Sequence, residues 1–528
     1  MRDLPAAPDA PADRPSSTAT AAPGGSLGQE VPAGVIPPGS LPPLRYRDLP
    51  DALPLRAMVG PGIILAGLAL GSGEYVLWPY ITYKSQFVFF WASVVGVTMQ
   101  YFINMEITRW TLATGETALT GFCRMSRHWP WVFLVMNVVP YLIPAWAKGA
   151  AQLVSWLIWG PGDQGGGAFV TELAMAGLVL CGVVLAAGPV VYETVERLQM
   201  ILVTLVMVLV IVIAGWLLWD RPDAIAAQAR ATVTLGYPSI IPPLDDDLTA
   251  AMLLAALAFA GCGGTLNLAQ SDYIRDKGYG MGRYIGRITS PITGQEEPIS
   301  EVGYHFPATA ANLERWRRWW RNAGWEHFLS FYLTCLVCLV LLTLISYTLF
   351  YDEQGQRLPG AAEYHEDMNF ILGQANGLAE RIGYPARVMF LVVGIAILLT
   401  TEFGILDAAS RISTDIVKVR WLRENPRWTE SRLYYLFLWG TIVLGCLVLY
   451  FGTQGNLIWF KTVAAMNGGV MWLYSCTLMY LNIRCLPPAL RMCGWRRAVM
   501  SAVIVFFGFF AIWATCDTLR AAYALLGG

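Results

Sequence analysis

Three charged side chains lie deep inside apolar stretches of the sequence. Glu74 follows the small-residue run Gly71-Ser72-Gly73, while Lys148 and Glu402 each fall well inside an apolar stretch. A charge at the centre of a membrane helix costs at least ~2.5–3.5 kcal/mol on insertion scales, so each needs a partner or a function. A carboxylate binds cations or protons, and a buried ammonium replaces a coupling cation or transfers a proton.

Lys148 has two interpretations that the sequence leaves open. It forms an inert buried pair with Glu74 or Glu402, or it takes part in coupling as a fixed cation or proton carrier. The CxxC pair Cys335 and Cys338 lies in an apolar run without a nearby histidine. We therefore interpret these cysteines as small helix residues without a metal or redox role.

The composition identifies the class of protein that must position these groups. Of 528 residues, 55% are hydrophobic and only 14% are charged, against roughly 25% charged residues in globular domains. So few charges cannot cover a soluble protein of this size, and lipid allows backbone spans only as helices or closed barrels. We predict an all-α polytopic integral membrane protein with the lipid bilayer as its partner. The balance of 36 basic against 37 acidic residues argues against nucleic-acid binding.

Eleven apolar stretches are long enough to cross about 30 Å of hydrocarbon as helices. With the N-terminus inside, 27 of the 36 Lys and Arg residues fall on the cytoplasmic side and 8 outside, and Lys148 lies within a span. This asymmetry predicts an N-in/C-out topology in the plasma (inner) membrane. The stretches are 58–83, 87–108, 131–159, 169–188, 198–219, 248–274, 328–350, 387–410, 432–451, 456–482 and 497–519.

Two segments fall outside the spans. Residues 1–44 contain ten prolines and no aromatic residue, so we predict a disordered cytoplasmic tail over 1–56, before a transmembrane domain over 57–525. A cytoplasmic insert, 276–327, ends with Arg and Trp interleaved over Glu314–Arg321. This pattern predicts an amphipathic helix anchored at the membrane interface, and the functional alternative is an anionic-lipid site.

Glycine clusters interrupt the first and sixth spans, at Gly71–Glu74 and at Ala260–Thr265. Glycine inside a helix costs ~1 kcal/mol relative to Ala. The clusters therefore indicate close helix packing or discontinuous helices around a site at the bilayer midplane. Their separation by five spans favours the second interpretation, with inverted repeats over about 57–220 and 247–483 and an extra helix at 497–519.

The run from Gly60 to Glu74 resembles the first helix of the Nramp (natural resistance-associated macrophage protein) family of divalent metal transporters. Further similarities are found at Ala113-Thr114-Gly115, Glu193–Leu205 and Leu481–Arg497. The resemblance implies a LeuT-like fold with a 5+5 inverted repeat. It also implies transport of manganese or iron, commonly coupled to protons.

The motifs of the metal site differ from those of the family. Where the family has Asp-Pro-Gly-Asn in helix 1, this chain has Gly71-Ser72-Gly73-Glu74. Where the family has Met-Pro-His-Asn in helix 6, this chain has Gly263-Gly264-Thr265-Leu266. The aspartate and the thioether are lost, which predicts a larger pocket with oxygen ligands, a type suited to Mg²⁺, Ca²⁺ and Mn²⁺.

We predict that substrate binds between the two interruptions, with Glu74 as a metal ligand and Lys148 and Glu402 as coupling or charge-relay groups. The binding set is Gly71, Ser72, Gly73, Glu74, Ala260, Cys262, Gly263, Thr265 and Asn467. Asn467 has an equally good interpretation as a packing residue, and we assign Gln100 and Asn137 to packing. Asp407 with Arg411, and Glu106 with Arg109, have the spacing of local ion pairs.

The leading hypothesis is an Nramp-related secondary transporter that moves a hard divalent ion such as Mg²⁺ or Mn²⁺ by alternating access. Protons are a candidate coupling ion. Two alternatives stay open: the same fold carrying an amino acid or amine, or a transport-inactive receptor or scaffold in which Glu74 and Lys148 neutralise each other. No pattern typical of an enzyme or a bound cofactor is present in the sequence.

Overall fold

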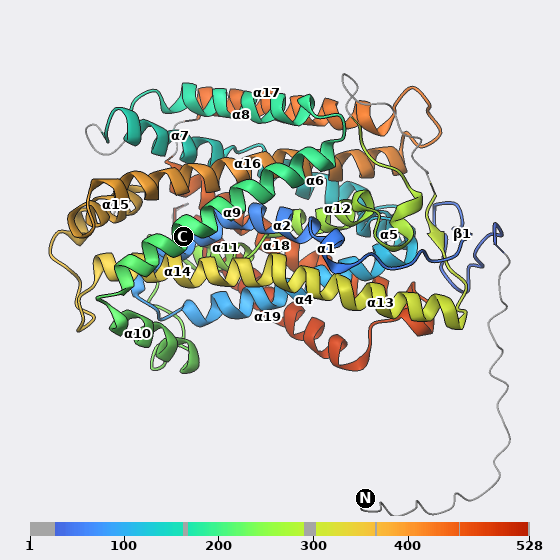
Figure 1. The fold of residues 1–528 in the computed structure, drawn as a ribbon, viewed down its shortest axis with the longest axis horizontal. Coiled ribbons are helices and arrows are strands. Elements are labelled where there is room, and N and C mark those ends of the chain that lie inside the picture. Colours follow the sequence, from blue (N-terminus) through green and yellow to red (C-terminus); the bar gives the residue numbers. More distant parts are fainter. Residues whose placement is uncertain (1–26, 162–166, 290–301, 365–366, 453–454, 526–528) are drawn as a thin grey trace, which may run out of the picture.

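Long helices form the whole bundle in the computed structural model (Figure 1). The structure describes all residues except 1–26, 162–166, 290–301, 365–366, 453–454 and 526–528, and the side chains of Ser72, Glu363 and 521–525 are also outside the described part. Within this part, eight helical segments are long and apolar enough to cross a membrane. They are α2–η1–α3 (Pro61–Ser85), α6–α7 (Trp129–Ile158), α8 (Val170–Ala187), α9 (Val191–Leu218), α13–η5–α14 (Ala310–Phe350), α16 (Tyr384–Arg420), α17 (Glu430–Phe451) and α19 (Gly494–Leu525).

The other three predicted spans are also helical, although they are too polar or too short to meet the same criteria. They are α4 (Phe90–Thr114), α11 (Ala250–Ala258) continued by α12 (Ala269–Lys277), and α18 (Asn456–Arg484). A helix therefore lies at each of the eleven predicted places, and the all-α membrane architecture is confirmed. The count of eleven membrane crossings and the N-in/C-out orientation stay predictions.

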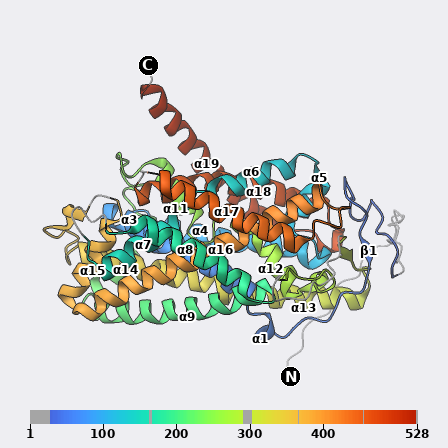
Figure 2. The ribbon, with the colours of Figure 1, turned by 90° about the horizontal axis from the view of Figure 1, so that it is seen from above.

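The burial of each helix reflects its position in the bundle. In Pro61–Ser85, 94% of the most apolar stretch is buried inside the protein, against 28% in α8. The first span therefore lies in the core of the bundle, whereas α8 lies at its periphery and presents an apolar face to lipid. The long helix α16 packs against α2, α7, α9 and α17. Figure 2 shows that the C-terminal part of α19 projects beyond the bundle.

Short elements close the two ends of the bundle. The end at the right of Figure 1 holds the two-stranded sheet, α1, α5 and α13, and the opposite end holds α10 and α15. The elements not yet bounded are β1 (Arg45–Tyr46), β2 (Tyr304–His305), α1 (Leu55–Met58), α5 (Ala118–Met125), α10 (Pro222–Val233), η3 (Gly264–Leu268), η4 (Gly280–Tyr284), η6 (Ala361–Tyr364), α15 (Asn369–Arg381) and η7 (Pro488–Leu490).

Residues 27–54 form an ordered segment, here called the strap, that lies across one end of the bundle. The strand β1 pairs in parallel with β2, with Tyr46 opposite His305. Val31, Ile36 and Leu44 are at most 2% exposed. The prediction of disorder over 1–56 is therefore wrong from residue 27 onward, because buried apolar side chains, which also include Tyr46 and Leu49, and the pairing of β1 with β2 hold this proline-rich segment on the bundle.

The Arg/Trp-rich segment forms the middle of α13, a helix that begins at Ala310 and ends at His327. Its inner face packs on protein, because Trp319 is 1% exposed and its Nε1 donates to the carbonyl of Pro50 at 2.8 Å. Arg315 forms an ion pair with Asp51 at 2.9 Å. Only the outer face of α13, where Trp325 is 55% exposed, is free to contact the membrane interface. The helix is thus partly a docking surface for the strap.

Acidification should loosen the strap. Burial lowers the pKa of His305 from 6.5 to about 4, and its Nδ1 lies 3.0 Å from the carbonyl of Ala113. The pKa of His305 is lower in the folded protein than in the unfolded chain. Burial of the neutral imidazole is therefore fully compatible with the folded state above pH 6.5, and stability is lost as the pH falls towards 4. At pH 5 the strap should be less stable by about 2 kcal/mol. Hydrogen exchange at the Arg47 amide, which donates to the His305 carbonyl at 2.8 Å, measures this.

The control is His305→Gln, which removes the titrating group. After correction for intrinsic exchange, the variant should show no extra opening between pH 7 and pH 5. Equal pH dependence in both proteins would contradict the assignment to His305.

Candidate substrate and ion site

The first span is continuous through its glycine cluster. Residues Leu70–Leu77 form a π-helix, η1, between α2 (Pro61–Ala69) and α3 (Trp78–Ser85). The prediction of a discontinuous first helix is therefore wrong, because the wider turn absorbs Gly71–Glu74 without ending the helix. Short π-helical segments inside α-helices are frequently found at functional sites.

The sixth span is interrupted as predicted. Helix α11 ends at Ala258, and the chain is non-helical until η3 begins at Gly264. Gly263 and Gly264 have φ of +71° and +58°, in the left-handed region that favours glycine. Gln100 of α4 donates to the carbonyl of Ala258 at 2.8 Å and accepts from the amide of Gly263 at 3.2 Å. Gln100, predicted to be a packing residue, thus satisfies backbone groups that the interruption frees.

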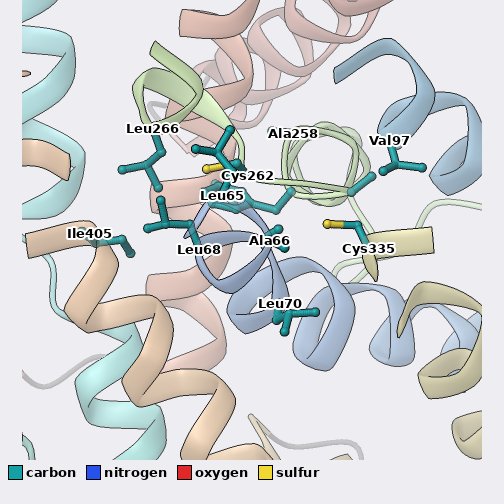
Figure 3. Packing of buried hydrophobic residues seen from close by; sticks show 14 of the residues in the cluster. Leu65, Ala66, Leu68, Leu70, Val97, Ala258, Cys262, Leu266, Cys335 and Ile405 are labelled. Carbon is teal, nitrogen blue, oxygen red and sulfur yellow. The ribbon is translucent and has the colours of Figure 1, made fainter. Parts of the chain in front are cut away.

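The glycines of both segments allow very close packing. A Cβ at Gly73 would lie 1.4 Å from the carbonyl oxygen of Phe259, so the backbone of η1 touches the interruption of the sixth span. A Cβ at Gly264 would lie 1.7 Å from Oδ1 of Asn467. The expectation of a larger pocket at these positions is wrong for this conformation, because neighbouring groups fill the space. Figure 3 shows the buried apolar side chains of the same region, with Leu65 and Leu68 beside Cys262 and Leu266.

Glu74 is fully buried, at 0% exposure, in this contact region. Neither carboxylate oxygen has a partner in normal hydrogen-bond geometry, although the thiol of Cys335 approaches it as a weak donor. Cys262 and Cys338 also interact with it electrostatically. The CxxC pair is therefore a neighbour of the buried carboxylate, a role that its apolar sequence context concealed.

These groups do not form a complete metal site in this conformation. Among the described residues, no cluster of three or more His, Cys, Asp or Glu side chains is close enough to hold a metal ion. The side chain of Ser72 lies outside the described part. Any metal ligation by Glu74 therefore requires a rearrangement of the surrounding helices or ligands from the backbone.

Lys148 and Glu402 contact different groups from those around Glu74. The ammonium of Lys148 lies 4.3 Å from the centre of the Trp459 ring and interacts electrostatically with Asp367. Oε2 of Glu402 accepts from the amide of Ala147 at 3.1 Å, at the start of α7 (Ala145–Ile158). Of the interpretations left open for Lys148, a pair with Glu74 is not formed, because neither carboxylate oxygen of Glu74 has a hydrogen-bond partner.

The third span is also interrupted, in addition to the sixth, and this was not predicted from the sequence. Helix α6 (Trp129–Tyr141) ends before Pro144, and α7 starts at Ala145. Pro140 and Pro144 were the available signal, because proline removes a backbone donor and disfavours a helix at the residue before it. Tyr141 at this bend donates to Oδ1 of Asn467 at 3.0 Å.

Uncharged polar side chains connect the interrupted third and sixth spans with neighbouring helices. The hydroxyl of Thr265 donates to Oδ1 of Asn137 at 2.9 Å, and Nδ2 of Asn267 donates to the hydroxyl of Tyr474 at the same distance. All four residues are buried. Asn137, predicted to be a packing residue, therefore contacts the candidate site. Amides inside apolar stretches were the signal for this network.

Contacts close both ends of this region. At the strap end, the amide of Gly62 donates to Oε1 of Glu326 at 3.0 Å, and the hydroxyl of Tyr279 donates to the carbonyl of Met58. At the opposite end, Lys84 pairs with Asp247 at 2.6 Å. These contacts join the elements on either side of the candidate site at both ends of the region.

The two predicted local ion pairs are confirmed. Arg411 contacts Asp407 at 2.9 Å and also bonds Asp276, with all three groups fully buried. Arg109 contacts Glu106 at 2.7 Å. These pairs contribute to helix packing near the strap end.

Comparisons with known proteins identify the fold. A manganese transporter mutant of Eremococcus coleocola matches with a TM-score of 0.61 at 10% identity, covering 91% of each chain. Mhp1, a nucleobase-cation-symport-1 family transporter with bromovinylhydantoin bound, matches with a TM-score of 0.50 at 11% identity, covering 89% of this chain and 93% of Mhp1. An uncharacterised protein of Pasteurella multocida is 20% identical over 465 residues, 83% of this chain and 93% of that protein. No family model matches the sequence.

The chain therefore has the LeuT-like fold of secondary transporters, and the fold prediction is confirmed. The solved neighbours include a transporter of a metal ion and one crystallised with an organic ligand. The fold alone does not select between these substrate classes.

Replacing Gly73 with Ala should strongly destabilise the protein. The new methyl group would overlap the carbonyl of Phe259, so η1 or the interrupted span must move, at a cost of about 1–3 kcal/mol or more. The matched control is Gly469→Ala in α18, where a Cβ meets no atom within 4 Å. Thermal unfolding in detergent should show a lower Tm for Gly73→Ala alone. Equal Tm values would contradict the close contact.

Proposed function

We propose that this protein is a secondary transporter related to the Nramp family and that it moves a divalent metal ion by alternating access, with Glu74 as the cation-binding group. The observation that carries the proposal is the buried carboxylate of Glu74, which has no partner in normal hydrogen-bond geometry and lies in the π-helical segment, next to the interrupted sixth span. Discontinuous helices at the interface of two repeats are where transporters of this architecture bind ions and substrates.

A lone ionised carboxylate inside a protein is expensive, since its hydration is lost without compensation. A cation or a proton at Glu74 removes this cost. The same carboxylate would therefore bind metal and proton in alternation, which couples their movements through one group.

The sulfur atoms near Glu74 bear on the choice between Mg²⁺ and Mn²⁺, the two ions that the sequence favours. Mg²⁺ strongly prefers oxygen ligands, whereas later divalent ions accept sulfur more readily. The thiol of Cys335 approaches the carboxylate of Glu74, and the thiols of Cys262 and Cys338 are buried in the same region. A thiol that reached an ion bound at Glu74 would favour Mn²⁺ over Mg²⁺. The similarity of fold to a manganese transporter agrees with this choice but does not carry it.

Glu402 and Lys148 have secondary roles in this proposal. Glu402 binds the first turn of α7 after the bend in the third span. Lys148 lies beside Trp459 near the start of α18, at the end of the bundle opposite the strap. We propose that they respond to the opening of that end and do not ligate the metal. The excess of Lys and Arg on the strap side supports a cytoplasmic N-terminus in the plasma (inner) membrane.

Uptake into proteoliposomes tests the central role of Glu74. The initial rate of Mn²⁺ uptake should fall at least about tenfold in Glu74→Gln, because a neutral amide attracts the cation less and cannot exchange a proton. The matched control is Glu172→Gln, which makes the same change at an exposed carboxylate at the start of α8. It should transport normally.

Other outcomes separate the competing functions. Metal uptake that survives Glu74→Gln rules out this site. Thermal stabilisation of the wild-type protein by amino acids or amines, with no response to metals, transfers the proposal to an organic substrate. Absence of both responses favours a receptor or scaffold.

Replacing one thiol should change metal selectivity. In Cys335→Ser a hydroxyl replaces the sulfur beside Glu74, so inhibition of Mn²⁺ uptake by Cd²⁺, a softer ion, should weaken several-fold, while inhibition by Mg²⁺ should not weaken. Cys476→Ser, at an exposed thiol of α18, is the control. Unchanged Cd²⁺ inhibition in Cys335→Ser would show that this thiol does not reach the ion.

A further inference from the structure

A cavity of about 320 Å³ opens near the strap end, away from the candidate transport site. It lies where α4 contacts both α13 and α19. Aromatic and basic side chains dominate its wall, which consists of Tyr101, Met105, Trp320, Arg321, Gly324, Trp325, Phe328 and Arg496. Nothing in the transport proposal uses this cavity.

The buried charges beside the cavity do not balance. The carboxylate of Glu106, which is fully buried, accepts from Arg109 at 2.7 Å and from Arg496 at 2.5 Å. Its only other side-chain partner among the described residues is the neutral amide of Asn482. Two guanidinium groups on one carboxylate leave one excess positive charge at a site with little access to water, which is costly unless an anion binds.

Of the two arginines that contact Glu106, Arg496 has a guanidinium nitrogen without a hydrogen-bond partner. The residue is 7% exposed, and its Nη2 is buried with no hydrogen-bond partner. The guanidinium lies 5.0 Å from the centre of the Trp320 ring and 5.1 Å from that of Trp495, and Arg496 forms part of the cavity wall. A guanidinium nitrogen with spare donors suits a phosphate oxygen.

The rim of the cavity has the character of a membrane interface. Trp325 and Trp495 are 55% and 59% exposed, and tryptophan is enriched at the depth of lipid headgroups. Leu329 and Leu333 follow along the same helix and are 46% and 41% exposed. The cavity therefore has a basic, aromatic interior beside an exposed apolar path suited to an acyl chain.

We propose that this cavity binds the headgroup of an anionic phospholipid. The phosphate lies between Arg496 and Arg321, the tryptophans flank the glycerol region, and one acyl chain lies along Leu329 and Leu333. The exposed apolar path favours a lipid over a free phosphate, which would gain nothing from it.

Helix α13 connects the proposed lipid site with the contacts at the strap end. Helix α13 supplies Trp320 and Arg321 to the cavity, and the same helix supplies Glu326, which binds the amide of Gly62 at the start of the first span. A lipid that holds α13 in place thus stabilises the closed strap end. Anionic lipid therefore favours the conformation with these contacts formed over one that is open at this end.

The full-length protein, purified and delipidated in neutral detergent, allows a direct test. Its Tm is measured with phosphatidylglycerol, with phosphatidylcholine and with inorganic phosphate. Phosphatidylglycerol alone should raise the Tm. The concentration required should increase on the order of tenfold in Arg321→Gln and in Arg496→Gln, since each loses a charged hydrogen bond. The matched controls are Arg317→Gln and Arg497→Gln, at exposed arginines on the same two helices outside the cavity wall.

Each other outcome overturns the proposal. Stabilisation by inorganic phosphate as strong as that by the lipid would make the ligand a soluble anion. Equal increases in Tm with phosphatidylglycerol and phosphatidylcholine would show only non-specific solvation of the protein by lipid. Arg496→Gln also removes a partner of Glu106, so failure of this variant to fold leaves the decision to Arg321→Gln. A response of Arg321→Gln equal to that of Arg317→Gln would rule out a phosphate site here.

Discussion

The contact between the backbone of η1 at Gly73 and the carbonyl of Phe259 is the constraint on which the centre of the molecule depends. It requires a residue without a Cβ on the first span and an interrupted helix on the sixth. Glu74, one residue further along, is fully buried, and Gln100 satisfies backbone groups that the interruption of the sixth span frees.

The family resemblance and the structure agree on architecture and differ on chemistry. The sixth span is interrupted as the resemblance implies, whereas the first span is continuous. Where the resemblance implies an aspartate and a methionine as ligands, this chain has Gly71 and Gly263, and its buried carboxylate is that of Glu74, which the thiol of Cys335 approaches. A transporter fold tolerates this exchange because the rigid helices, and not the ligands, maintain the architecture.

Much of the fold could be predicted from the sequence, because long apolar stretches and charge asymmetry are one-dimensional signals. The interruption of the sixth span was also visible, since clustered glycines such as Gly263 and Gly264 have a conformational meaning. The π-helix at Leu70–Leu77 was not, because its glycines serve close packing within a continuous helix. The proximity of Cys335 to Glu74 depends on how distant helices are oriented around their axes. The docking of the strap depends on a surface built from α5, α13 and β2, which no local pattern describes.

The strap is covalently continuous with the first span. Only α1 separates the two, and the carbonyl of Met58 at its end is bound by Tyr279. Any outward movement of the start of α2 must therefore pull on Leu49 and Pro50, which are tied to α13 through Asn312 and Trp319. If the proposed transport cycle opens that end, the strap acts as a tether whose release adds to the activation barrier. Transport rate would then be tuned by residues that never meet the substrate, and sequence change in the strap would alter the speed of the cycle while leaving its selectivity intact.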